Sequence, residues 1–375
     1  MDDMILDDYS LEEIAGKVSN FYNFKKEFKA WHKPRKQWVR SCQWKNSLNH
    51  LLEDVSYNDI TTIKYFSLPG EDCLDIKVLS EQCHTNNKKF YFQGIESNDI
   101  CAQKSQSSVV SQIMDLEYID PKSTLHAKSC FEEIRGKNSS LFAKLSECAP
   151  FHIINLDFTN SIFSHSKGRS TMQAICTFLN KQLDQQYLKW QLYVTTRCNL
   201  EAIDVDILKE YMETILNNCE ENPKFETLMR NSNYTSLQEP FTIDNLIEDS
   251  DYIEKLVIVA FLKWLTILAV KKNVKISLFS SAEYTVKNEA TCPDMVSLVI
   301  EFKKNNAPID PTNINYDAVS LNEKELALNV CSKFFSKTKN VDTLLIENET
   351  IHNCLKDEIK NLLKNIGYDI SLYPY

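Results

Sequence analysis

Hydrophobic and polar residues alternate along the middle of the chain with two different periods. Four compact apolar runs have the length and composition of buried strands, at residues 63–68, 89–96, 151–158 and 190–196. Stretches with apolar residues at helical spacing lie between them, at residues 73–81 and 171–186. Strands that alternate with helices in this way are typical of a parallel sheet covered by helices, so the pattern predicts an α/β fold.

The end of this pattern differs from its beginning. Residues 256–270 form an apolar run that predicts a buried helix, and two further strands are expected at 274–280 and 295–302. A short polar connection without a helix joins these two strands, and neighbouring strands connected in this way are normally antiparallel. The sheet is therefore expected to be mostly parallel, with an antiparallel hairpin at its end.

The pattern is less regular between residues 100 and 147. Residues 109–118 could hold a strand or the end of a helix, and residues 123–135 predict a helix. The third strand of the sheet is consequently the least certain in position.

Three segments follow from this reading of the chain. Residues 1–58 are expected to form a helical N-terminal arm that begins with an amphipathic stretch at 1–20. Residues 59–305 are expected to form the α/β domain. Residues 306–375 are expected to be a linker and a small helical C-terminal appendage, with its helices between 322 and 366.

Composition narrows the class of protein. The net charge of −10 and the pI of about 5.3 argue against a protein that covers nucleic acid with its whole surface. The six glycines are scattered along the chain, so no glycine-rich phosphate-binding loop is present. Any nucleotide must be held by other groups.

The cysteines indicate the compartment. All twelve are widely spaced and no CxxC pair occurs, so we expect neither a zinc ribbon nor a disulfide framework, and no metal site. Reduced cysteines of this kind are typical of a cytoplasmic protein. The acidic start lacks the apolar core of a signal peptide, and the run at 256–270 is interrupted by Lys263 and too short to span a membrane.

The order of these elements resembles the Rossmann-like sheet of class I S-adenosylmethionine-dependent methyltransferases, whose last two strands form a hairpin. Within that superfamily the pattern is nearest to the tRNA guanine dimethyltransferases. The turns that carry the resemblance are FSLPGEDCLD at 66–75 and NLDFTNS at 155–161. Ligands of open α/β sheets bind beyond the carboxyl ends of the strands, so both turns are expected to face one crevice.

The resemblance implies S-adenosylmethionine as the cofactor and assigns residues to it. Gly70, with Glu71 or Asp72, would approach the methionine part. Glu96, at the end of the second strand, would bond the ribose hydroxyls, because a carboxylate can accept two hydrogen bonds from a vicinal diol. Asp115 would lie near the adenine.

The resemblance also assigns the acceptor side of the site. Asp157 and Asn160 would orient or deprotonate an exocyclic amine of the methyl acceptor, and Phe158 would stack on a base. Arg197, which ends the next strand, could contact a substrate phosphate or be an ordinary solvated arginine. Tyr284 could line the acceptor pocket or serve packing.

One basic and aromatic segment stands out in this acidic chain. Residues 25–45 hold eight Lys or Arg residues against one acid, and three of the five tryptophans. Cations interleaved with aromatic residues are typical of a surface that binds a phosphate backbone and stacks on bases. The candidate nucleic-acid-binding residues are Lys33, Arg35, Lys36, Trp38 and Arg40. The alternative is a basic segment that docks on the acidic body of the protein or on a partner, or covers the cofactor pocket.

Two functions are therefore expected from the sequence. The first is S-adenosylmethionine-dependent methyl transfer to a nucleic acid, with RNA favoured. The alternative is a catalytically inactive module of the same fold that binds a nucleotide or scaffolds other protein subunits, for example in a bacterial defence assembly. The first turn has one glycine and Phe158 replaces the proline usual in the family, which keeps this alternative open. His152, within an apolar strand, is expected to be a core residue and not a base.

Overall fold

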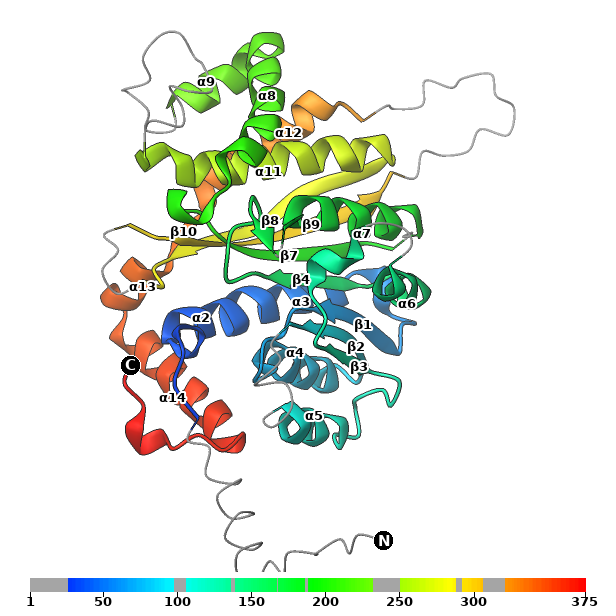
Figure 1. Cartoon of the computed structure of the whole chain (residues 1–375), viewed down its shortest axis with the longest axis vertical. Coiled ribbons are helices and arrows are strands. Elements are labelled where there is room, and N and C mark those ends of the chain that lie inside the picture. Colours follow the sequence, from blue (N-terminus) through cyan, green and yellow to red (C-terminus); the bar gives the residue numbers. More distant parts are fainter. Residues whose placement is uncertain are drawn as a thin grey trace, which may run out of the picture.

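The structure is a computed structural model of the whole chain, shown in Figure 1. The residues that it describes are 26–97, 106–135, 139–166, 168–185, 188–231, 250–287, 292–305 and 321–375. The amphipathic stretch expected at 1–20 lies outside them.

The centre of the protein is one twisted sheet of eight strands, counted over the described residues, in the order β10-β8-β9-β7-β4-β1-β2-β3. Strands β3, β2, β1, β4 and β7 run parallel, and β9 runs antiparallel to both β7 and β8. The strands are β1 (Thr62–Ser67), β2 (Lys89–Glu96), β3 (Thr124–Ala127), β4 (Ile153–Asp157), β7 (Trp190–Arg197), β8 (Val274–Tyr284), β9 (Met295–Lys304) and β10 (Lys339–Asn340). This arrangement confirms the expected Rossmann-like sheet with an antiparallel terminal hairpin.

Helices cover both faces of the sheet, because successive residues of each strand point to opposite faces and both sets are apolar. In β7, Leu192 and Val194 face one core, and Tyr193 faces the other. The first face is covered by α6 (Ser140–Cys148), α7 (Thr171–Gln185), α8 (Val205–Glu221), α9 (Pro223–Asn231), α11 (Ser250–Lys271) and α12 (Glu323–Lys337).

The second face carries the beginning and the end of the described chain. Figure 1 shows the blue N-terminal helices beside the red C-terminal helix α14. The elements of this layer are α2 (Pro34–Trp38), a π-helical stretch η2 (Val39–Trp44), α3 (Lys45–Leu52), α4 (Leu74–Thr85), α5 (Gln106–Met114), α13 (Val341–Glu347) and α14 (Glu349–Asn365). Both ends of the chain thus contribute to a core that they share with the sheet.

Most predicted elements are confirmed, and one is wrong. Residues 123–135 were expected to be a helix, but Thr124–Ala127 form β3 and only Phe131–Ile134 form a single 3₁₀ turn. This edge strand is short and pairs on one side only. Four residues are too few to distinguish the alternation of apolar and polar residues in a strand from helical spacing. Residues 109–118 mostly belong to helix α5.

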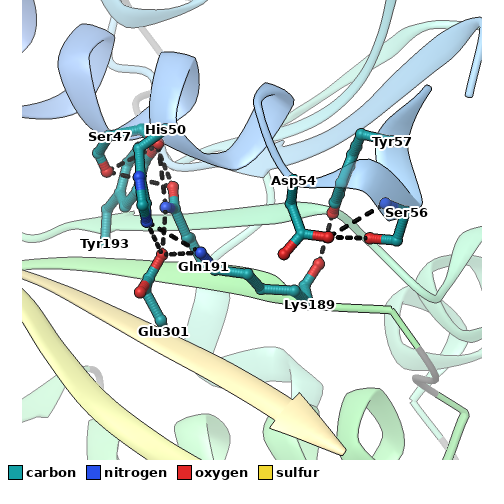
Figure 2. Close-up of polar contacts among 9 residues, drawn as sticks. All are labelled: Ser47, His50, Asp54, Ser56, Tyr57, Lys189, Gln191, Tyr193 and Glu301. Atoms are coloured by element: carbon teal, nitrogen blue, oxygen red, sulfur yellow. Dashed lines mark hydrogen bonds and ion pairs between the residues drawn. The ribbon is translucent and has the colours of Figure 1, made fainter.

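The N-terminal helices are fixed to the sheet at its amino edge by a polar network, shown in Figure 2. The Ser47 hydroxyl and the Tyr193 hydroxyl each donate to Oε1 of Gln191, at 3.1 and 2.9 Å. Gln191 in turn donates to Glu301, which also pairs with Lys189 at 2.8 Å. Because these buried groups satisfy one another, they hold α3 in one position on β7 and β9.

No helix in the described part of the chain has the length and apolar character needed to cross a membrane. Within the same ranges, no three His, Cys, Asp or Glu side chains converge in a way that could hold a metal ion.

Candidate functional site

A cavity of about 160 Å³ lies beyond the carboxyl ends of the parallel strands, where β1 and β4 meet. This is the position at which the strand order reverses and at which open α/β sheets bind ligands. Its walls come from four places: the turn after β1, the turn after β4, the ends of β7, β8 and β9, and the segment before and within α2 and η2. The lining residues are Ala30, Trp31, Lys36, Arg40, Leu68, Pro69, Gly70, Asp72, Leu74, Asp157, Phe158, Thr159, Arg197, Tyr284, Val286 and Met295.

Strand register brings the two turns together. Ser67 of β1 pairs with Gly94 of β2 on one side and with Asn155 of β4 on the other. Two residues further along each chain segment, Pro69, Glu96 and Asp157 are therefore at the same height along the sheet. Gly94 leaves room for this turn, because a side chain there would meet Pro69 and Leu125. Gly70 adopts a positive φ of 66°, which a residue with a side chain would adopt only under strain.

The central contact of the cavity joins the N-terminal segment to β4. Lys36 Nζ lies 2.5 Å from Asp157 Oδ1, 3.4 Å from the Thr195 hydroxyl and 4.6 Å from the centre of the Trp44 ring. Lys36 is only 4% exposed. Burial lowers the pKa of Lys36, and the charge of Asp157 opposes that effect. Asp157 is therefore an ion-pair partner here, which leaves it poorly placed to act as a general base.

Asp72 ties the site to both ends of the described chain. Its Oδ2 accepts hydrogen bonds from His32 Nε2 at 3.0 Å and from the Tyr368 hydroxyl at 2.9 Å. The backbone N–H of Lys29 donates to His32 Nδ1 at 3.0 Å, so the imidazole is neutral with its proton on Nε2.

The pKa values of this pair agree with that assignment. Burial lowers the pKa of His32 below its ordinary value, which keeps the ring neutral. Burial opposes the charged form of Asp72 as well, but the hydrogen bond from His32 and the charge of Lys26, 3.6 Å away, outweigh it and lower the pKa of Asp72. The carboxylate is thus ionised and its function is structural.

A second buried chain of polar groups lies beneath the cavity. Asn155 donates to the Tyr65 hydroxyl at 2.8 Å, and this hydroxyl donates to Asp75 at 2.6 Å. Burial raises the pKa of Asp75. These hydrogen bonds join β1 to β4 and to the first turn of α4.

Two arginines face the cavity without a carboxylate partner among the described residues. Arg40, 4% exposed, donates through a terminal nitrogen to the Trp31 carbonyl at 3.0 Å. The Nε atoms of Arg40 and Arg197 are both buried and have no hydrogen-bond partner within the described ranges. Burial lowers the pKa of Arg40, but a guanidinium remains protonated in proteins.

The structure brings together some of the predicted site residues and separates others. Gly70, Asp72 and Asp157 line one cavity. Glu71 and Glu96 are half-buried and lie outside its lining, although Glu96 is level with Pro69 by strand register. The side chain of Asn160 is exposed, and only its carbonyl contacts the site, as the acceptor for Arg197 N–H at 3.2 Å.

The prediction for Asp115 is wrong. Asp115 is exposed in the turn after α5, and four residues later Ile119 pairs with Phe90 at the start of β2. Glu96 lies at the other end of the same strand, six residues beyond Phe90. The misplacement follows from the error in locating β3.

The structure buries most of the residues that were predicted to bind nucleic acid. Lys33, Lys36, Trp38 and Arg40 are buried, so they are not available to a phosphate backbone or to a base. Arg35 forms an ion pair with Asp342 and donates to the Thr285 carbonyl at 3.0 Å. The alternative of a docked segment that covers the pocket describes what the structure contains.

Several lining residues were missed or left open. Met295 was not singled out, because nothing in its sequence context separates it from a core position; Trp31 was noted only as an aromatic residue of the basic segment. Arg197 and Tyr284 were considered with two explanations each, and both line the cavity. Both residues could be recognised by their position, because Arg197 is the last residue of β7 and Tyr284 is the last residue of β8.

The strand order, the antiparallel β9 and the crevice at the switch point together define a chain of the class I methyltransferase fold. The chain belongs to the PP_RS20740-like family, whose model matches residues 25–375. No curated protein matches its sequence.

Two solved structures illustrate its similarity to known proteins. One is a Listeria monocytogenes protein assigned as a class I S-adenosylmethionine-dependent methyltransferase, with a TM-score of 0.39 and 11% identity over 96% of this chain and 81% of that chain. The other is loganic acid methyltransferase with SAH, with a TM-score of 0.30 and 9% identity over 75% of this chain and 99% of that chain. Neither is a tRNA guanine dimethyltransferase, so the narrower resemblance stays a prediction.

Proposed function

We propose that this protein binds S-adenosylmethionine beyond the ends of β1 and β2 and transfers its methyl group to an acceptor held in the cavity beside β4 and β7. The observation that carries the proposal is the shared cavity formed by the turn at Gly70 and the turn at Asp157. Both turns lie at the switch point of a sheet with the class I methyltransferase strand order.

The residues present fit such a cofactor in part. Open space lies beside Gly70, where a side chain would meet no atom within 4 Å, so a ligand can approach the backbone. Glu96, at the end of β2 and level with Pro69, would accept hydrogen bonds from the ribose hydroxyls. S-adenosylmethionine, when bound, supplies a methyl group on a positively charged sulfur. The role of the protein is then to align the acceptor with it and exclude water.

The site is small and partly covered in this conformation. A cavity of about 160 Å³ is smaller than the ~300–1,000 Å³ usual for pockets that bind cofactors. The pair Lys36–Asp157 spans the crevice, and Trp31 and Arg40 lie over it. Cofactor entry therefore requires the segment that contains α2 and η2 to shift, in the manner of other active-site lids.

The sequence also suggested that the methyl acceptor is a nucleic acid, and two features of the structure argue against it. The cations assigned to it are buried, and the cavity is too small for a nucleotide strand. Filter binding of a single-stranded RNA over a range of salt concentrations tests it, because binding to phosphates weakens steeply as salt increases.

The partly covered crevice also favours a second candidate, a module of this fold that has lost the methyl donor and acts as a scaffold. Calorimetric titration with S-adenosylmethionine and S-adenosylhomocysteine separates the two functions. Methyl transfer predicts binding of both nucleotides and at least ~10-fold weaker binding by Glu96→Gln, which corresponds to ~1.4 kcal/mol. Asp115→Asn, a matched change at an exposed acid outside the lining of the cavity, should bind like the unmodified protein. Absence of binding by either nucleotide would leave the scaffold.

A further inference from the structure

The charges that line the cavity are not balanced. Three cationic side chains, Lys36, Arg40 and Arg197, face it, against the two carboxylates Asp72 and Asp157. Lys36 and Asp157 neutralise each other, and Asp72 pairs with Lys26. Among the residues that line the cavity, this leaves Arg40 and Arg197 without an ion-pair partner, although the charges of Asp157, Asp75 and Asp72 act on Arg40.

Both arginines also have unsatisfied donors. The buried Nε atoms of Arg40 and Arg197 have no acceptor among the described residues, and an unmade hydrogen bond to a buried charged group is costly. The two arginines come from different elements that line the cavity, Arg40 from η2 and Arg197 from the end of β7. An anionic group between them would satisfy both, and guanidinium groups bind carboxylates well because the two are planar and complementary.

The remaining walls are apolar. They are formed chiefly by Trp31, Leu68, Phe158, Val286 and Met295. The cavity volume of about 160 Å³ is close to that of an engineered apolar cavity of ~150 Å³ that holds one benzene molecule. These apolar walls suit an acceptor that carries a small ring or a short aliphatic chain beside its charged group.

We propose that the methyl acceptor is a small apolar monocarboxylic acid, bound by Arg40 and Arg197 and converted to its methyl ester. This inference rests on the proposed methyl transfer and specifies its substrate class. A carboxylate oxygen forms the new bond to the methyl carbon while the carbon–sulfur bond breaks, and the electron pair of that bond stays on sulfur as the neutral thioether.

No proton moves in this reaction, because the acid is already ionised at neutral pH. Ester formation therefore requires no general base, whether or not Lys36 stays paired with Asp157. An amine or hydroxyl acceptor would instead need a group free to remove a proton.

The test uses the full chain and pairs of ligands that differ only in charge. Benzoate, phenylacetate and hexanoate are titrated beside benzamide, phenylacetamide and hexanamide, with and without saturating S-adenosylhomocysteine. We expect at least one acid to bind ~10-fold or more tightly than its amide, and Arg197→Gln to remove that preference. Arg169→Gln, at an exposed arginine of the short β5–β6 hairpin (His165–Ser166 and Arg169–Ser170), is the matched control and should keep it. With S-adenosylmethionine, the preferred acid should yield its methyl ester.

The possible outcomes separate this inference from the function on which it rests. Equal binding of acids and amides, while S-adenosylhomocysteine binds, overturns the carboxylate acceptor and leaves methyl transfer in place. Selective binding of acids without any binding of S-adenosylhomocysteine overturns methyl transfer and the ester-forming step together. Because Arg197 lies at a strand end and is half-buried, Arg197→Gln is expected to fold, and circular dichroism verifies this.

Discussion

Lys36 Nζ and Asp157 Oδ1 lie 2.5 Å apart, although the two residues are separated by 121 positions in the chain. This contact fastens the N-terminal segment to the end of β4. It partly covers the crevice at the switch point of the sheet, where a small cavity remains. The basic segment of this acidic protein thus packs over the site.

The Lys36–Asp157 pair should show strong energetic coupling. Lys36→Met and Asp157→Asn each leave one charge without its partner, and we expect each to lower the free energy of unfolding by about 3 kcal/mol. The double variant should lose less than the sum, with a coupling energy of about 1–3 kcal/mol. Urea unfolding of the four proteins measures this. Additive losses would mean that the pair does not hold the segment in place.

Cofactor binding should loosen the covering segment. If S-adenosylhomocysteine displaces Lys36 from Asp157, backbone amides of residues 34–44 should exchange hydrogen faster in its presence. Helix α11, buried on the opposite face of the sheet, should be unchanged and provides the internal control. Hydrogen exchange with mass spectrometry makes the comparison. Slower exchange of 34–44 would instead indicate that the ligand binds under the segment as it stands.

The hydroxyl of Tyr368 should stabilise the association of the two ends of the described chain. Tyr368→Phe removes the hydrogen bond to the ionised Asp72, and we expect a loss of about 1.5–3 kcal/mol, the usual range for a bond to a charged group. Tyr375→Phe is the matched control, because the hydroxyl of Tyr375 is not part of this network. Thermal or urea unfolding distinguishes them. An equal effect of both changes would show that the contact to Asp72 contributes nothing.

His152 should make the protein less stable as the pH falls. Burial lowers the pKa of His152 to about 4, and its Nδ1 accepts a hydrogen bond from the Lys64 backbone N–H at 3.0 Å. Between pH 6.5 and 4 the unfolded chain takes up a proton that the folded chain does not, so stability decreases as pH decreases. The full effect is about 3 kcal/mol, at 1.36 kcal/mol per pKa unit.

His152→Asn tests this assignment, since asparagine can keep the acceptor without titrating. Its stability should change less between pH 6.5 and 4 than that of the unmodified protein, measured by urea unfolding at a series of pH values. Identical pH profiles would assign the acid sensitivity to other groups.

The fold could be predicted from the sequence, because long strands that are buried on both faces appear as compact apolar runs. Residues 89–96, expected as a strand, coincide with β2, and the hairpin of β8 and β9 follows from the missing helix between them. The short edge strand β3 was not predicted, because four residues are too few to show the alternation of a strand. The error then displaced Asp115 from the site.

The site was harder to predict from the sequence, because the segments that cover it are far in sequence from the strand ends on which they pack. The turns at Gly70 and Asp157 could be placed together from strand order alone. Nothing local indicates that Lys36 pairs with Asp157 or that Tyr368 reaches Asp72, contacts that span 121 and 296 residues. A basic segment has the same composition whether it binds phosphates or covers a pocket, so composition could not decide between these two roles.

A crystal structure of the protein grown with S-adenosylhomocysteine tests the central claim most directly. The account predicts ligand density beyond the ends of β1 and β2, with the ribose at Glu96, the amino acid part at Gly70, and Lys36 Nζ withdrawn from Asp157. Density for the nucleotide at any other place, or an unchanged Lys36–Asp157 contact with no ligand at a saturating concentration, would contradict it.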